Sequence, residues 1–277
     1  MYIPFYVQNI LRLALEEDIG HCDITTTFTI PEGHRSKAVL VSKGNFILAG
    51  MPFAEEVFHI MDAGTVLRTF HEEGSKVTRD DIIAEIAGNT KTLLSCERVS
   101  LNILQRLCGI ATLTRAFVEK VKGTGVKIVD TRKTTPGLRF MEKYAVRMGG
   151  GSNHRFGLFD GILIKDNHIE AAGSITAAIS SARQAHHLSK IEVEIENLNE
   201  LKEAIHAGAD VIMLDNMSIE DMKEAVKMAG GKAILEASGN MNLERVRDVA
   251  ETGIALISIG ALTHSAPAAD ISMKIAR

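Results

Sequence analysis

The sequence predicts two structural regions: an α+β region followed by an open, incomplete parallel α/β barrel. From Val126 onward, short apolar runs alternate with amphipathic helical segments, as in a parallel sheet covered by helices. Glycines that would end these helices recur at intervals of 23 residues (Gly208 to Gly231) and 22 residues (Gly231 to Gly253). This spacing indicates a repeating helix–strand unit.

Six strand-like runs are expected in the barrel region. They are Val126–Val129, Gly161–Ile164, Ile191–Ile195, Val211–Leu214, Ala233–Leu235 and Ala255–Ile259. A closed barrel of this kind has eight strands. Six runs therefore favour a sheet that does not close.

The region before residue 126 lacks this regular alternation of strands and helices, which is typical of an α+β domain. An amphipathic helix is expected over residues 6–18, and Gly109 separates two later helical patterns, Thr92–Leu107 and Ala111–Val121. The other expected elements are the strands Ala38–Ser42, Asn45–Ala49, Thr65–His71 and Ile82–Ile86, and a helix over Pro52–Met61.

Composition and charge argue against several classes of partner. The 277 residues carry a net charge of −4, with 45% hydrophobic and 24% charged residues, so neither a nucleic acid nor a membrane is expected to bind. Cys22, Cys96 and Cys108 are odd in number and scattered, and the N-terminus lacks the basic region of a signal peptide. We expect a cytoplasmic protein with no disulfide framework and no structural zinc.

Charged residues follow five consecutive expected strands. They are Asp130, Arg132 and Lys133 after the first, then Lys165, Glu194, Asp215 and Glu236 after the others. Because the carboxyl ends of parallel strands converge, and active sites occur there, this pattern favours a shared functional mouth over unrelated solvent-exposed ends.

The stretch from Asp130 to Ile169 is cationic within an acidic chain. It holds seven Arg and Lys residues and four acids, a net +3 in a chain whose total is −4. A cationic pocket of this size predicts a small polyanionic ligand and not a nucleic-acid surface.

Two further signals have more than one interpretation. Small residues at Ser238–Asn240 and Ile259–Ala261 would let backbone N–H groups approach a phosphate near a helix N-terminus, or they are ordinary strand-to-helix turns. Glu194 and Asp215 could bind a sugar diol or Mg²⁺, or pair with Lys165 when no ligand is bound. Glu192 and Glu196 share a face with Glu194, so spacing alone does not select among these acids.

Several common catalytic motifs are absent. The sequence contains no H-E-x-x-H metal motif, Walker loop, G-x-S-x-G nucleophile elbow or dinucleotide fingerprint. His186 and His187 lie in a polar helical context and are expected to be exposed rather than to bind a ligand.

Long strings of the sequence resemble the quinolinate phosphoribosyltransferase family. They are DTRKTTPGLR, EKYAVRMGGGSNHRFGLFDGILIKDNHI, EVEIEN, IMLDN and EASGN, preceded by EEDIGHCDITT and CERVSLNILQRLCGIAT. The resemblance implies an N-terminal α/β sandwich domain (residues 1–109), an open α/β barrel (110–264) and a C-terminal segment (265–277) that packs back on the first domain.

The resemblance also implies an activity: magnesium-dependent transfer of phosphoribose from phosphoribosyl pyrophosphate to quinolinate. The products are nicotinate mononucleotide, pyrophosphate and carbon dioxide, in de novo NAD biosynthesis. It further implies a homodimer with shared active sites, and leaves open whether dimers assemble further.

Site residues carry over from the family position by position. Arg132, His154, Arg155 and Lys165 would hold the two quinolinate carboxylates, and Lys133 and Lys165 would face the pyrophosphate. Glu194 and Asp215 would bind the ribose hydroxyls and Mg²⁺, directly or through water, while Ser238, Gly239, Asn240, Ile259, Gly260 and Ala261 would surround the 5-phosphate. Thr131 joins the substrate-binding residues, and Arg98 would enter the site of the neighbouring subunit.

Two alternatives remain from the residues. Lys165 at the end of an apolar strand would suit a Schiff-base nucleophile, as in barrel aldolases. The second alternative is a non-catalytic relative that binds a dicarboxylate or an oxyanion. Lys133, Glu194 and Asp215 together argue against this alternative.

Overall fold

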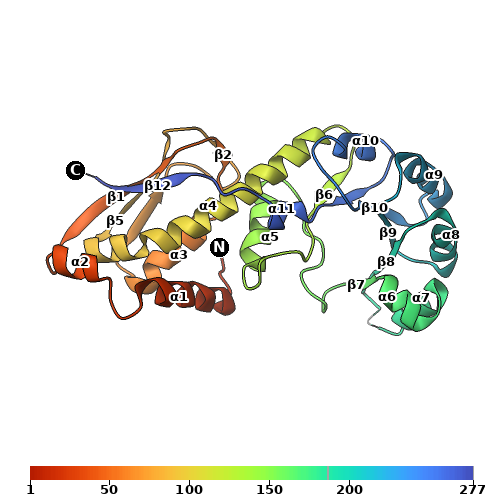
Figure 1. Ribbon diagram of the computed structural model, residues 1–277, viewed down its shortest axis with the longest axis horizontal. Helices are drawn as coiled ribbons and strands as arrows, with labels where there is room; N and C mark the ends of the chain where they lie inside the picture. Colours follow the sequence, from red (N-terminus) through yellow and green to blue (C-terminus); the bar gives the residue numbers. More distant parts are fainter. Residues whose placement is uncertain (186, 277) are drawn as a thin grey trace. The chain divides into compact units, whose positions relative to one another are not determined.

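The structure, a computed structural model, describes residues 1–185 and 187–276. It divides into two compact units: Met1–Arg115, Thr134–Gly150 and Thr263–Arg277 form the first, and Ala116–Lys133 and Gly151–Leu262 form the second (Figure 1). The expected exposure of His186 lies outside the described residues, whereas His187 is exposed.

The first unit is built on an antiparallel sheet in the order β12-β1-β5-β3. Its strands are β1 (Arg35–Ser42), β3 (Val66–Thr69), β5 (Ile82–Asn89) and β12 (Ile271–Ile275). Strand β12 lies beside β1 (Figure 1) and pairs with it, with Leu40 opposite Met273. Alternate residues of β1 are buried, so one face of this sheet packs against the core. A separate antiparallel pair joins β2 (Phe46–Ile47) to β4 (Lys76–Val77).

Helices supply the rest of the first unit's core. They are α1 (Phe5–Ile19), α2 (Ile24–Thr29), α3 (Met51–Met61), α5 (Arg139–Met148) and the long α4 (Thr90–Lys120), which continues into the second unit. The expected helix over residues 6–18 corresponds to α1, whose Val7, Leu11 and Leu15 are buried. A buried carboxylate, Glu142 of α5, accepts hydrogen bonds from Arg106 of α4, with Nε–Oε1 at 2.8 Å.

The expected break between two helices at Gly109 is wrong, because α4 runs through it without interruption. A single glycine costs a helix only about 1 kcal/mol relative to alanine, so tertiary packing can override it. A Cβ built on Gly109 would lie 2.0 Å from the Pro267 carbonyl oxygen. The glycine therefore allows the C-terminal segment to lie against the helix, and the expected domain boundary after residue 109 falls inside α4.

The second unit contains one parallel sheet in the order β6-β11-β10-β9-β8-β7. Its strands are β6 (Lys127–Val129), β7 (Ile162–Ile164), β8 (Ile191–Ile195), β9 (Val211–Asp215), β10 (Ile234–Ser238) and β11 (Leu256–Ser258). Strands β6 and β7 are its two edges, so among the described residues the sheet stays open. The expected open α/β barrel is confirmed.

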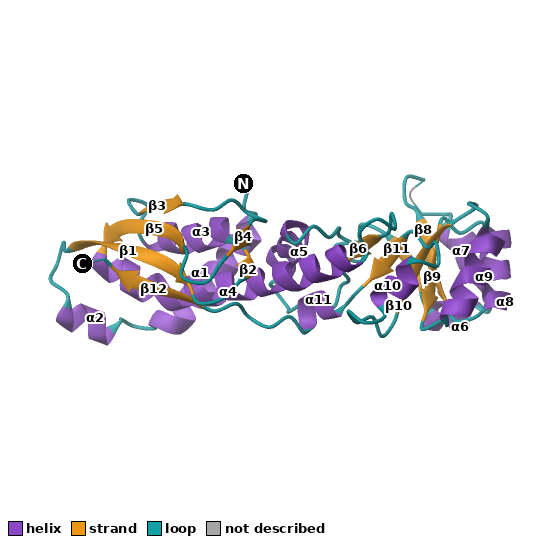
Figure 2. Ribbon diagram, turned by 90° about the horizontal axis from the view of Figure 1, so that it is seen from above, coloured by secondary structure: helices purple, strands orange, loops and turns teal. Residues whose placement is uncertain are grey.

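Helices follow the strands of this sheet: α6 (Asp166–Ala172), α7 (Ile175–Ala182), α8 (Leu198–Ala207), α9 (Ile219–Ala229), α10 (Val246–Ala250) and, at the unit's end, α11 (Ala261–His264). Figure 2 shows α7, α8 and α9 along one face of the strands. Gly208 caps α8 in the left-handed conformation as expected. The C-cap of α9 is Gly230 and not Gly231, while the C-cap of α10 is Glu251, two residues before Gly253.

Over the residues that the structure describes, no helix combines the length and the apolar character needed to cross a membrane.

Replacing Gly109 with alanine is expected to destabilise the protein by about 1–3 kcal/mol, despite the helix-favouring effect of alanine. The added Cβ would collide with the Pro267 carbonyl and displace the C-terminal segment. Denaturant titration of the free energy of unfolding tests this. Gly44→Ala, whose Cβ would meet no heavy atom within 4 Å, is the control, and a Gly109→Ala protein as stable as the wild type would contradict the close packing.

Candidate active site

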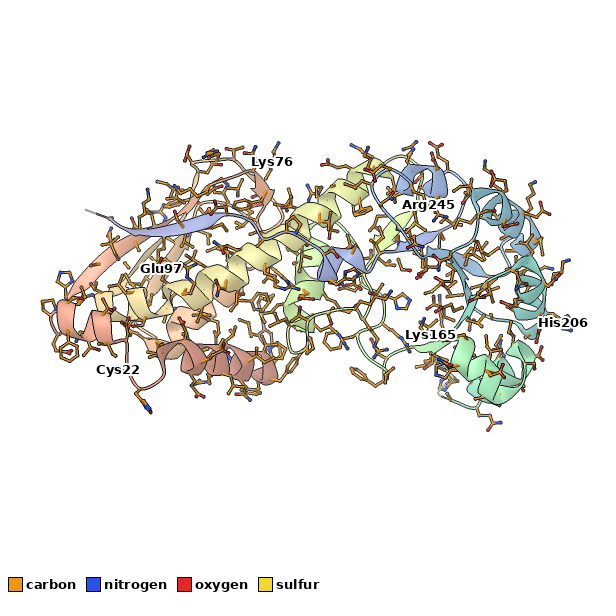
Figure 3. The ribbon with its side chains drawn as sticks, in the orientation of Figure 1. Cys22, Lys76, Glu97, Lys165, His206 and Arg245 are labelled. Carbon is orange, nitrogen blue, oxygen red and sulfur yellow. The ribbon has the colours of Figure 1, made fainter. Side chains whose placement is uncertain are left out.

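A cavity of about 540 Å³ opens at the carboxyl ends of the second unit's strands. Eleven expected site residues line it: Thr131, Arg132, Lys133, His154, Arg155, Lys165, Glu194, Asp215, Ser238, Gly239 and Asn240. Leu163, Met213, Asn216 and Ser258 complete the lining. Lys165 lies on the inner side of the sheet, whereas His206 of α8 lies on the outer side (Figure 3).

The remaining expected residues do not line this cavity. Ile259 is buried, and its N–H continues the sheet by donating to the Val129 carbonyl at 3.0 Å, so Ser258 lines the cavity instead of Ile259, Gly260 and Ala261. Arg98 is exposed on α4 in the first unit.

The turn Ser238–Asn240 does not lead directly into a helix. The next helix, α10, begins only at Val246. The favourable helix dipole expected for a phosphate at this turn is therefore absent, and the backbone of the turn itself must supply the N–H groups.

Lys165 and Glu194 face each other across neighbouring strands at the rim. Lys165 Nζ forms an ion pair with Glu194 Oε2. The side chains are 43% and 18% exposed, so a ligand can reach both. Lys165 was expected to pair with Glu194 or Asp215 when no ligand is bound, and the structure shows the pair with Glu194.

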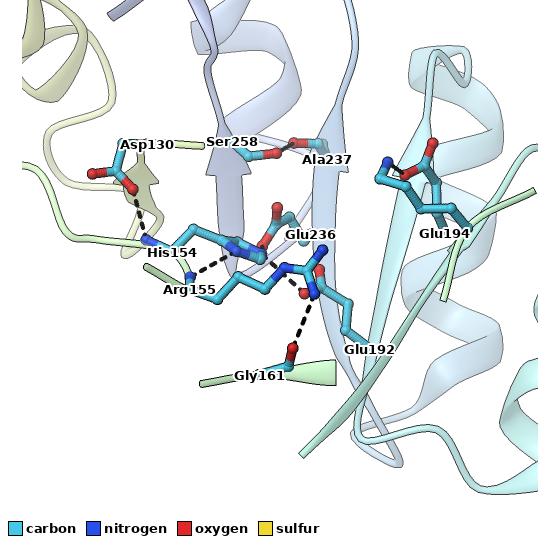
Figure 4. A network of polar contacts seen from close by, with 10 residues as sticks. Asp130, His154, Arg155, Gly161, Glu192, Glu194, Glu236, Ala237 and Ser258 are labelled. Atoms are coloured by element: carbon cyan, nitrogen blue, oxygen red, sulfur yellow. Dashed lines mark hydrogen bonds and ion pairs between the residues drawn. The ribbon is translucent and has the colours of Figure 1, made fainter. Parts of the chain in front are cut away.

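Two buried carboxylates, Glu192 and Glu236, lie one layer below the rim (Figure 4). Both are two residues before a rim residue on the same strand, Glu194 on β8 and Ser238 on β10, and alternate residues of a strand share a face. Neither oxygen of Glu236 has a hydrogen-bond partner among the described residues. Glu196 is exposed and does not line the cavity, so the structure separates the three acids that spacing left equivalent.

His154 is held above these acids in one tautomer. Its Nδ1 accepts the Arg155 backbone N–H at 2.8 Å, so the proton lies on Nε2, which is 2.9 Å from Glu192 and 3.8 Å from Glu236. The buried Asp130 carboxylate accepts the His154 backbone N–H at 2.8 Å. The ring thus donates its Nε2 proton toward the buried acids.

The electrostatics of the site favour an anionic ligand. Burial, and then the neighbouring Arg132 guanidinium, lower the pKa of Arg155, which means that the charged forms of the two arginines oppose each other. The Arg155 Nη1 donates to the Gly161 carbonyl at 2.9 Å, which fixes the side chain. A bound carboxylate would relieve this repulsion.

The titration of the buried Glu236 carboxyl is strongly displaced. Burial, and then the Glu192 carboxylate, raise its pKa to about 7. The sequence pattern placed Asp130 and Glu236 at the shared mouth but gave neither a role in the site, although an acid inside an apolar strand is a signal that marks Glu236 for such a role.

Comparison with known proteins identifies the family. Residues 23–108 match the profile described as "Quinolinate phosphoribosyl transferase, N-terminal domain", and residues 110–274 match the corresponding C-terminal domain. The chain belongs to the quinolinate phosphoribosyltransferase family. The resemblance inferred from sequence strings is therefore confirmed.

Relatives of this phosphoribosyltransferase family match along almost the whole chain. The Bacillus subtilis protein named "Probable nicotinate-nucleotide pyrophosphorylase [carboxylating]" is 48% identical over 97% of this chain and 93% of its own length. The chloroplastic "Nicotinate-nucleotide pyrophosphorylase [carboxylating]" of Arabidopsis thaliana is 40% identical, over 98% of this chain and 84% of its own. The crystal structure of NadC from Streptococcus pyogenes superposes with a TM-score of 0.95 at 42% identity, covering 100% of this chain and 99% of that one.

Glu236→Gln is expected to remove a pH dependence of stability. Between pH 4.5, the ordinary value for the unfolded chain, and the folded pKa of about 7, the folded protein keeps a proton that the unfolded chain has released. Stability therefore falls as the pH rises through this window and then levels off. From about pH 5 to about pH 8, the wild type should lose roughly 1–3 kcal/mol more free energy of unfolding than the variant.

The matched control for this experiment is Glu196→Gln, which changes an exposed carboxylate that directly follows β8 of the same sheet. It should keep the pH dependence of the wild type. Identical pH profiles for the wild type and Glu236→Gln would contradict a neutral buried acid.

Proposed function

We propose that this chain transfers phosphoribose from phosphoribosyl pyrophosphate to quinolinate and releases pyrophosphate and carbon dioxide, leaving nicotinate mononucleotide for NAD biosynthesis. The observation that supports this activity most is the meeting of four cations with two rim carboxylates in one cavity: Arg132, Lys133, Arg155, Lys165, Glu194 and Asp215. Membership of the family supports the same reaction.

The four cations match the charge of the two substrates. Quinolinate carries two carboxylates, and guanidinium groups such as those of Arg132 and Arg155 bind carboxylates in a bidentate manner that also fixes the plane of the ring. Lys133 and Lys165, as compact point charges, suit the pyrophosphate. A ring fixed in this way keeps its nitrogen in line with the anomeric carbon, which is a positioning contribution to the rate.

Glu194 and Asp215 suit the sugar. Departure of pyrophosphate leaves an electron-poor, oxocarbenium-like ribose, which nearby carboxylates stabilise electrostatically while the lysines neutralise the leaving group. The ion pair between Lys165 and Glu194 holds the ammonium and carboxylate groups at the rim before substrate binds. It also disfavours Lys165 as a Schiff-base nucleophile, because an ammonium group in an ion pair does not attack a carbonyl.

Carbon dioxide leaves after the ring nitrogen has been alkylated. The bond between the ring and the adjacent carboxylate breaks, the electron pair stays on the ring carbon beside the cationic nitrogen, and that carbon then takes a proton. No covalent intermediate with the protein is required. The residues of the site therefore act by holding and orienting the two substrates.

Magnesium is part of the proposal. Glu194 and Asp215 fit this ion, because they are carboxylates on the adjacent strands β8 and β9 that line the same cavity, and Mg²⁺ prefers oxygen ligands, often through water. When bound, the ion supplies positive charge to the pyrophosphate.

A cytoplasmic homodimer is the proposed form of the enzyme. Large apolar side chains are exposed on α1 and α2, among them Phe5 at 77% and Phe28 at 82%, and such surfaces are typical of interfaces. The exposed Arg98 would complete the partner's site. The described cysteines, Cys22, Cys96 and Cys108, are all free thiols, which is consistent with a reducing compartment.

Replacing Lys133 with alanine is expected to lower kcat/KM by about 30- to 1,000-fold, a loss of roughly 2–4 kcal/mol of transition-state stabilisation. Quinolinate-dependent release of pyrophosphate and carbon dioxide is the measurement, and it also tests the activity of the wild type. Lys190→Ala removes an exposed lysine just before β8, at the opposite end of that strand, and should keep normal activity. Near-normal turnover of Lys133→Ala would argue strongly against the assignment.

Mixing two inactive variants tests the shared site. Arg98→Ala and Arg155→Ala are each expected to be inactive while folding normally. If Arg98 acts in the partner's site, mixed dimers contain one site with both arginines, and about a quarter of the wild-type activity should return under random exchange. Mixtures that exchange subunits but stay inactive would contradict the shared site.

A further inference from the structure

Asparagine side chains tie together the ends of β9 and β10 at the cavity. Asn216 Nδ2 donates to Asp215 Oδ2 at 2.8 Å, and Asn240 Nδ2 donates to Asn216 Oδ1 at 3.0 Å. The main chain adds a third link, from the Asn216 N–H to the Ser238 carbonyl at 3.1 Å. The Asn216 amide therefore joins the Asp215 carboxylate to the turn Ser238–Asn240.

Both asparagines have a backbone conformation that costs energy. Among the described non-glycine residues, positive φ angles occur at Asp80 (69°), Asn216 (53°) and Asn240 (47°). A left-handed conformation costs most non-glycine residues about 1 kcal/mol or more, and it costs asparagine less because its short polar side chain can form local hydrogen bonds. Two of these three residues line the cavity, and strain that persists at a binding site points to a functional requirement there.

Gly239 confines the Asn216 amide. Its φ is +88°, and a Cβ added to it would lie 2.1 Å from Asn216 Oδ1 and 2.4 Å from Asn216 Cγ. The amide thus lies directly against the Gly239 main chain, where no larger residue would leave it room. In this position its donor faces Asp215 and its acceptor faces Asn240.

We propose that Asn216 is a positioning residue that couples the ribose-binding and phosphate-binding parts of this site. The inference rests on the proposed function, in which Asp215 binds the ribose and the turn Ser238–Asn240 binds the 5-phosphate. One amide fixes an oxygen of Asp215 and, through Asn240, the turn. The Asp215 carboxylate and the turn are therefore held at a fixed separation before the sugar phosphate binds. This lowers the entropic cost of ordering these protein groups on binding.

Asn216→Gly tests this role, because glycine adopts the left-handed backbone without strain and removes only the amide. The probe is ribose 5-phosphate, which carries the sugar hydroxyls and the phosphate and needs no metal. In calorimetric titration of the whole protein, its dissociation constant should rise about five- to twentyfold, while that of quinolinate should change less than about twofold.

Two further variants make the test specific. Asp80→Gly relieves the same kind of left-handed backbone in the first unit and should bind both ligands as the wild type does. Asn240→Gly should weaken ribose 5-phosphate binding, and the double variant with Asn216→Gly should lose less than the product of the two single effects, because both act through one hydrogen-bonded chain.

Wild-type affinity of Asn216→Gly for ribose 5-phosphate would overturn the inference, and so would an equal weakening of quinolinate binding. The proposed reaction is tested separately: a wild-type protein that binds ribose 5-phosphate but releases no pyrophosphate with quinolinate would contradict the reaction. In that case, selective loss of ribose 5-phosphate binding in Asn216→Gly would still support the positioning role.

Discussion

In-register parallel pairing of six strands is the constraint on which the rest of this site depends. It places every strand's carboxyl end at one edge, so that residues distant in the chain become neighbours: Ser238 pairs with Asp215, and Glu194 with Met213. Because side chains alternate between faces, the same register also stacks a second layer two residues down each strand. The rim holds the groups proposed to contact substrate, and the layer beneath holds Glu192 and Glu236.

The lower layer has an energetic cost that the upper layer helps to offset. A buried ionised carboxylate without a hydrogen bond is strongly unfavourable, and here the acids lie under a group of cations. Glu192 accepts the Nε2 proton of His154, and the raised pKa of Glu236 allows that acid to remain neutral over part of the pH range. The floor of the cavity is thus less negative than its composition suggests, and the attraction of the rim for anions is preserved.

The sequence alone was sufficient to predict the parts of the molecule that depend on local residue patterns. The six strands of the second unit follow from apolar runs, and the rim residues follow from charge after those runs. Gly109 was misinterpreted because its role is the approach of Pro267, a contact between segments far apart in sequence. Asn240 was expected at the phosphate turn, but its hydrogen bond with Asn216 and the left-handed backbone of both residues, from which the positioning role is proposed, follow from no spacing rule. Strand periodicity assigned Glu192, Glu194 and Glu196 to one face, but depth along that face separates them.

The pairing of β12 with β1 also has a consequence for synthesis on the ribosome. The edge of the first sheet stays open until the last stretch of chain has emerged, because its final strand is encoded after the entire parallel sheet. A nascent chain that stalls after the parallel sheet but before β12 would therefore expose a sheet edge in its oldest part, and quality control that recognises such edges would detect the missing strand.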